Sequence, residues 1–103
     1  MVTGHWNEGL DGPLTEAALA RKIASMGYRV DVYVYPPGTR FPPHTHDVDK
    51  VDAVLSGRFR ISLGGRSVEL TPGDWVEVPA GAEHSAEVVG DSPVVSMDAV
   101  RER

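Results

Sequence analysis

Residues 38–57 read GTRFPPHTHDVDKVDAVLSG and contain two of the chain's four histidines, His44 and His46. One residue separates the two, so in an extended segment both imidazoles point to the same face. Pro42 and Pro43 disfavour a helix immediately before the pair. Two imidazoles on one face are half of a metal site, and the other half has to come from elsewhere in the chain.

The composition indicates one small globular domain. The chain has 103 residues, 41% of them hydrophobic, and a net charge of −5 without any cluster of lysine and arginine. Nucleic acid and anionic membrane surfaces are therefore poor candidates as partners. The absence of cysteine excludes disulfides and fits a reducing compartment. No apolar run could span a membrane and the N-terminus lacks signal-peptide features, so we expect a cytoplasmic protein.

The first 13 residues predict an arm rather than a regular element. They contain three glycines and a proline and show no hydrophobic periodicity. Trp6 and Leu10 give this arm apolar side chains, and we expect them to pack against a neighbouring subunit.

A single helix is expected over residues 14–27. Thr15 can cap its start, and Gly27 suits the left-handed position after its end. Leu19, Ile23 and Met26 form one narrow apolar stripe, which is typical of a helix that lies on another structure.

Beyond Gly27 the hydrophobic period changes from 3.6 to 2. Short alternating runs separated by glycine and proline turns fill the rest of the chain, at residues 30–35, 51–55, 59–63, 68–70, 75–78, 86–89 and 94–97. Gly64 and Gly65 form a two-residue hairpin signal. About eight short strands with no helix between them predict an all-β antiparallel sandwich or barrel over residues 28–103.

A third histidine, His84, follows the turn Pro79-Ala80-Gly81 and opens a strand. In an antiparallel jelly roll distant strands become neighbours, so His84 can face His44 and His46. The pattern Gly38-(5)-His44-Thr45-His46-(3)-Lys50-(6)-Gly57 resembles the first motif of the cupin superfamily, and Gly73-(5)-Pro79-Ala80-Gly81-(2)-His84 resembles the second. With the flanking strands, the resemblance covers about residues 30–97.

The resemblance implies a small double-stranded β-helix barrel, usually dimeric, with three histidines and one glutamate around a divalent ion. Carried over to this chain, the expected metal ligands are His44, His46 and His84. Lys50 stands where the family has the glutamate, and Val88 stands where the second motif ends in asparagine. Three imidazoles suit zinc, iron, nickel, copper or manganese and leave positions open for water or substrate.

Lys50 therefore raises a specific problem. An ammonium about 5 Å from a divalent ion is repelled by roughly 6–7 kcal/mol at an effective dielectric constant near 20. We favour an arrangement in which Lys50 turns away and pairs with a carboxylate, with Asp52 the nearest by alternation and Asp49 or Asp47 available after a bulge. Alternatively, Lys50 stays near the metal as a base or nucleophile, or the site lacks tightly bound metal and Lys50 binds an anionic ligand.

Two classes of function remain open. The first is a metal-dependent enzyme for a small oxygen-rich molecule, of the dioxygenase, isomerase or decarboxylase type that the resemblance permits. Its catalytic candidates are Lys50, Asp52 and Tyr33. The second is a module that binds or senses a metal or small ligand without turnover. We also expect a homodimer, because the edge strands of a small sandwich need cover and the N-terminal arm can supply it.

Overall fold

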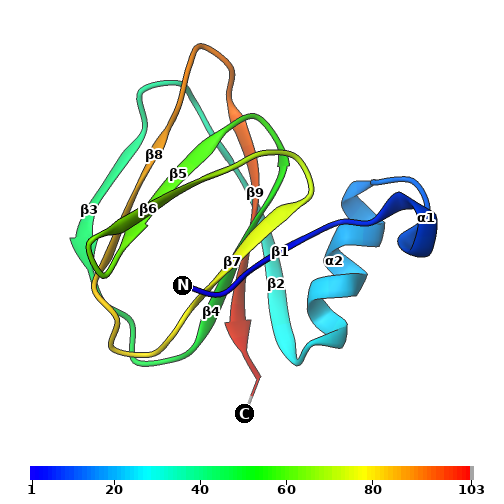
Figure 1. Cartoon of the computed structure of the whole chain (residues 1–103), viewed down its shortest axis with the longest axis horizontal. Coiled ribbons are helices and arrows are strands. Elements are labelled where there is room, and N and C mark those ends of the chain that lie inside the picture. The colour runs from blue at the N-terminus through cyan, green and yellow to red at the C-terminus, as the bar shows by residue number, and fades with distance from the viewer. Residues whose placement is uncertain (103) are drawn as a thin grey trace.

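The computed structural model describes residues 1–102 and shows two antiparallel sheets that face each other, with two helices outside one of them (Figure 1). The larger sheet has the strand order β1-β7-β4-β9-β2, and the smaller one has the order β3-β8-β5-β6. The strands are β1 (Thr3–His5), β2 (Tyr28–Tyr35), β3 (Arg40–His44), β4 (Lys50–Ser56), β5 (Phe59–Leu63), β6 (Arg66–Leu70), β7 (Asp74–Val78), β8 (His84–Val88) and β9 (Val94–Arg101). This architecture confirms the predicted all-β double-stranded β-helix.

The predicted helix is present as α2 (Glu16–Ser25). Its N-cap is Thr15, whose hydroxyl oxygen accepts a hydrogen bond of 3.1 Å from the Ala18 N–H, and Gly27 adopts a φ of 98° beyond its end. A second, four-residue helix, α1 (Glu8–Asp11), was not expected from the sequence. No helix within residues 1–102 is long and apolar enough to cross a membrane.

The apolar side chains form two clusters, one on each side of the larger sheet. The cluster inside the barrel consists of Val54, Phe59, Ile61, Leu70, Val76, Val78, Ala86, Val88 and Val94. The cluster between the sheet and α2 consists of Trp6, Leu19, Ile23, Tyr28, Val51, Ala53, Met97 and Ala99. On β4 and β9 the two sets alternate, so one side chain in two points into the barrel. This alternation leaves Lys50 and Asp52 facing inward with Val54.

The N-terminal arm packs on its own barrel, so the expected packing on a neighbouring subunit is wrong for Trp6 and stays a prediction for Leu10. Strand β1 pairs with β7, and Trp6 is only 5% exposed within the single chain. The Trp6 Nε1–H donates a hydrogen bond of 2.8 Å to the Gly12 carbonyl oxygen. Gly4 allows β1 to lie against the Trp75 side chain, because a Cβ at position 4 would lie 2.2 Å from the Trp75 indole. Leu10 remains 85% exposed and contributes nothing to this packing.

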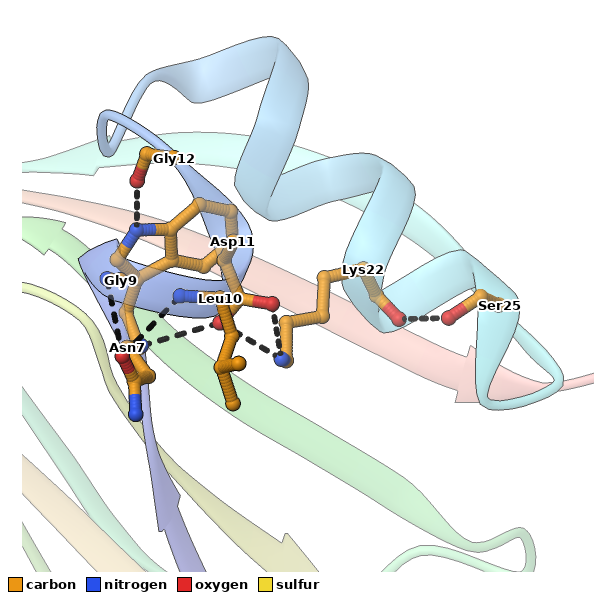
Figure 2. Close-up of polar contacts among 8 residues, drawn as sticks. Asn7, Gly9, Leu10, Asp11, Gly12, Lys22 and Ser25 are labelled. Carbon is orange, nitrogen blue, oxygen red and sulfur yellow. Dashed lines mark hydrogen bonds and ion pairs between the residues drawn. The ribbon is translucent and has the colours of Figure 1, made fainter.

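Lys22 joins the arm to α2, as Figure 2 shows. Its Nζ lies 2.9 Å from both carboxylate oxygens of Asp11, and this hydrogen bond holds the pKa of Asp11 below its usual value. The same ammonium lies 5.6 Å from the ring centre of Trp6 and 5.7 Å from that of Trp75. The arm is therefore fastened to α2 by an ion pair, and the Lys22 ammonium also lies close to Trp6 of the arm and Trp75 of the barrel.

The arm supplies a test of this packing. Trp6→Ala is expected to lower the free energy of unfolding by about 3 kcal/mol, because it removes a buried indole and leaves a cavity. Leu10→Ala in the same arm should change it by less than about 0.5 kcal/mol, since the side chain is exposed. Chemical denaturation of both variants measures the difference. Equal, small effects would show that the arm does not pack on the barrel.

Candidate metal centre

Three histidines from two stretches of the sequence meet inside the barrel. His44 ends β3, His46 lies just after it, and His84 begins β8. Their ring centres are separated by 4.8 Å for His44 and His46, 4.2 Å for His44 and His84, and 5.2 Å for His46 and His84. One ring nitrogen from each can be chosen so that all three lie within 4.8 Å of one another. The convergence predicted from the two motifs is confirmed.

The register between β3 and β8 brings two of these histidines together. His44 lies directly opposite His84, and Phe41 lies opposite Ala86. The register shifts between these two pairs, where Pro42 and Pro43 have no N–H to donate to the ladder. The prolines that only indicated an extended segment in the sequence therefore coincide with a bulge just before His44.

Two of the imidazoles are oriented by backbone carbonyl groups. His44 Nδ1 lies 2.6 Å from the Pro42 carbonyl oxygen, and His84 Nδ1 lies 2.9 Å from that of Ala82. A carbonyl oxygen only accepts hydrogen bonds, so each Nδ1 carries the proton and each Nε2 keeps its lone pair. Hydrogen bonds of this kind fix the tautomer and direction of imidazoles that bind metals.

The histidines line a cavity of about 160 Å³. Its other lining residues are Tyr35, Phe41, Lys50, Asp52, Phe59, Ala86 and Asp98. Tyr35 packs edge-on against Phe41, with ring centres 5.0 Å apart, and both rings contact Phe59. The cavity thus has one aromatic wall and one wall of ionisable groups.

Lys50 faces this cavity and pairs with Asp98, a partner that was not anticipated. Its Nζ lies 2.6 Å from Asp98 Oδ1, and its side chain is only 11% exposed. The favoured arrangement, a lysine paired with a carboxylate, is present, but the lysine has not left the site and Asp52 is not the partner. Asp49 lies outside the cavity lining and accepts a hydrogen bond of 2.8 Å from the Ala80 N–H. One feature of the sequence could have pointed to Asp98 as a residue of the site: it is the one charged residue in the mostly apolar run of residues 94–100.

Asp52 lies beside the ion pair. It is directly opposite Asp98 in the pairing of β4 with β9, so the two carboxylates occupy the same face of the sheet. Removal from water, and then the Asp98 charge, raise the pKa of Asp52 from 3.8 to about 6, while Lys50 acts in the opposite direction. Asp52 is therefore a carboxylate that can exchange a proton near neutral pH.

The surroundings of His46 and His84 favour the neutral form of the imidazole that metal binding requires. Burial lowers the pKa of His46, and the positive charge of Lys50 lowers it further. Burial also lowers the pKa of His84, although its hydrogen bond to Ala82 opposes the shift. Both rings consequently keep a free lone pair at pH values where an exposed histidine is partly protonated.

The two tyrosines of β2 differ in position. Tyr35 lines the cavity, and burial raises the pKa of its hydroxyl, so the phenol stays protonated. Tyr33, the tyrosine selected as a catalytic candidate, is 47% exposed, stacks on Tyr35 and is not part of the cavity lining. The structure therefore brings Lys50 and Asp52 to the histidines but leaves Tyr33 at the edge.

The raised pKa of Asp52 gives a pH-dependent prediction. The folded protein holds a proton on Asp52 up to about pH 6, whereas the unfolded chain releases it near 3.8. Ionised Asp52 therefore lowers stability above about pH 6, and this cost is relieved at lower pH. Asp52→Asn should raise the melting temperature of metal-free protein at pH 7.5, and the gain should shrink as the pH falls below 6. A gain that is independent of pH would contradict the assignment.

The donor set fits a divalent transition ion. Imidazole nitrogens bind such ions at about 2.0–2.1 Å, and one ring nitrogen from each histidine already lies within 4.8 Å of the other two. Three protein ligands leave coordination positions open, which is the arrangement of catalytic rather than structural metal sites.

Comparison with known proteins agrees with this geometry. The profile of the Cupin domain family matches residues 31–100. The uncharacterized protein y4oW of Sinorhizobium fredii is 36% identical over 56 residues, which cover 54% of this chain and 26% of that protein. The chain thus spans about a quarter of the length of this curated relative.

Solved structures share the barrel. The DMSP lyase DddQ from Ruegeria pomeroyi superposes with a TM-score of 0.66 at 26% identity, over 74% of this chain and 39% of that one. A cupin protein from Bacteroides fragilis gives 0.64 at 26% identity, over 82% and 73% of the two chains. KdgF from a Halomonas species gives 0.60 at 22% identity, over 76% and 82%, and this likeness concerns the fold alone.

Proposed function

Because the chain belongs to the Cupin domain family, we propose that it is a metal-dependent enzyme that acts on a small oxygen-rich molecule. In this proposal His44, His46 and His84 hold one divalent transition ion, and the substrate enters the cavity beside it. The identity of the ion is left to experiment, with zinc, iron, nickel, copper and manganese all compatible with three imidazoles.

One observation carries the proposal. Three imidazoles converge in the barrel interior, and two of them are oriented by hydrogen bonds from Nδ1 to backbone carbonyls. Histidines that served only packing would not need to bring one ring nitrogen each within 4.8 Å of the others, or to have their rings oriented by backbone carbonyls.

The chain's own residues can bind substrate and move protons. When bound, the ion would supply Lewis acidity toward a substrate oxygen. The Lys50 ammonium can donate a hydrogen bond to a second oxygen, while the Tyr35 hydroxyl stays protonated and can donate as well. Asp52, with its pKa near 6, can take a proton from a substrate carbon or oxygen and return it. Phe41 and Phe59 keep water from the opposite wall.

Dioxygenase, isomerase and decarboxylase chemistry all remain within this proposal. The likeness to a DMSP lyase adds lyase chemistry, which also needs a base beside a bound substrate. Asp52 is the residue of this chain that fits such a role.

A second candidate function is a non-catalytic module that binds or senses a metal or small ligand. The observation in its favour is the Lys50–Asp98 ion pair, because it places a paired ammonium where the family's motif has a glutamate ligand. A site with one fewer anionic ligand is expected to hold metal more weakly than a four-ligand site.

The test begins with protein purified without added metal. Elemental analysis should find close to one transition ion per chain, and incubation with small hydroxy- and oxo-carboxylates in D₂O, followed by proton NMR, should reveal turnover or deuterium exchange of at least one compound. Metal-stripped protein and Asp52→Asn should both be inactive. Stoichiometric metal without any turnover would favour the binding module. Absence of metal would refute the metal-dependent enzyme and leave only a module that binds a small ligand.

A further inference from the structure

We propose that the ligand of this cavity is a small anion, bound with one oxygen toward the three histidines and its carboxylate against Lys50. This inference rests on the proposed function, since it assumes an ion held by His44, His46 and His84. It assigns Lys50 as the residue that selects for negative charge.

The position of the Lys50 ammonium supports anion binding. An ammonium has three N–H donors, and the contact with Asp98 Oδ1 uses one, so donors remain for a second acceptor. The side chain is 11% exposed and lines the same cavity as the histidines. A buried ammonium with spare donors is stabilised by any oxygen anion that enters, because unmet donors in a low-dielectric site are costly.

The charge balance of the cavity points the same way. Lys50 and Asp98 cancel as an ion pair, and an imidazole that binds a metal through its lone pair carries no charge, so only Asp52 remains to offset the two positive charges of a bound ion. Ionised Asp52 leaves one positive charge, and protonated Asp52 leaves two. An anionic ligand neutralises this excess, whereas a neutral ligand of the same shape does not.

The size of the cavity restricts the anion. A volume of about 160 Å³ lies below the roughly 300–1,000 Å³ of pockets for drug-sized ligands. The aromatic wall of Tyr35, Phe41 and Phe59 offers contact to a short apolar part but few polar groups. A short carboxylate that carries a second oxygen on the adjacent carbon fits these limits, because that oxygen can face the histidines while the carboxylate reaches Lys50.

The test uses lactate and its neutral isostere lactamide with Co²⁺-loaded protein. The visible absorption of the bound Co²⁺ reports ligand entry without requiring turnover. Wild-type protein should bind lactate at least about tenfold more tightly than lactamide, the gain expected of a hydrogen bond to a charged group. Lys50→Met should remove this preference and leave lactamide binding unchanged. Arg66→Gln, which removes an exposed positive charge from β6, should behave as wild type.

A second variant keeps the test decisive if Lys50→Met does not fold. Asp98→Asn leaves Lys50 without its partner, so its lactate affinity should rise several-fold above wild type. Equal affinity for lactate and lactamide in wild type, or a preference that survives Lys50→Met, would overturn the inference while leaving the metal centre intact. Failure of Co²⁺ to bind at all would overturn the proposed function, and the inference with it.

Discussion

His84→Ala is expected to abolish stoichiometric binding of a divalent transition ion. The substitution removes one of three imidazoles that face a common point, and the affinity for Zn²⁺ or Co²⁺ should fall by at least about a thousandfold, more than the 10- to 100-fold typical when only a supporting residue is removed. The barrel should still fold, because His84 lies at the start of β8 and the apolar interior cluster does not include it.

The measurement is competition against a chelator with a known affinity, with circular dichroism to verify the fold. His5→Ala is the matched control, since His5 is the one histidine outside the cavity and pairs instead with Asp74. It should bind metal as wild type does. Retention of metal by His84→Ala, or an equal loss in His5→Ala, would mean that the three histidines are not the ligands.

The sequence predicted what depends on local pattern. Alternating side chains identified most strands, and Gly64 and Gly65 both take positive φ, as a two-residue hairpin needs. Thr15 caps α2 as expected. The three histidines could be predicted because two family motifs fix their spacing relative to turns, and each motif lies within one stretch of chain.

What the sequence missed depends on pairing between distant strands. Asp98 reaches Lys50 only because β9 lies beside β4 with Lys50 opposite Val100 and Asp52 opposite Asp98. The alternation of side chains places Asp52 on the same face of its strand as Lys50. It does not show which residue of another strand lies close enough to pair with Lys50. The prediction for Trp6 in the arm was wrong for a related reason. Burial of Trp6 requires that β1 pair with β7, which lies more than 60 residues away in the chain.

The pairing with Asp98 changes the interpretation of Lys50. From the sequence, three arrangements were open: a lysine that turns away to pair with a carboxylate, a lysine that stays near the metal as a base or nucleophile, and a site without tightly bound metal. The structure places Lys50 inside, with its charge balanced by Asp98. A neutralised lysine can remain beside a divalent ion at far lower cost than an isolated one, because the carboxylate of the pair attracts the ion that the ammonium repels.

Lys50→Glu is expected to tighten metal binding by at least about a hundredfold, because a repelling charge becomes an attracting one and a fourth ligand becomes available. The same change should lower the melting temperature of the metal-free protein, since it breaks the pair with Asp98 and gathers three carboxylates on one sheet face. Saturating Zn²⁺ should reverse the loss. Calorimetric titration and thermal melting with and without Zn²⁺ measure both effects.

Lys50→Met separates the two causes of that gain. Lys50→Met removes the ammonium and leaves the Asp98 carboxylate unpaired, so this variant should bind metal more tightly than wild type without gaining a ligand. The additional gain of Lys50→Glu over Lys50→Met then measures what the new carboxylate contributes. A Lys50→Glu variant that binds no more tightly than wild type would mean that position 50 cannot reach the ion, and the anion site assigned to Lys50 would then be too far from the histidines to share a ligand with them.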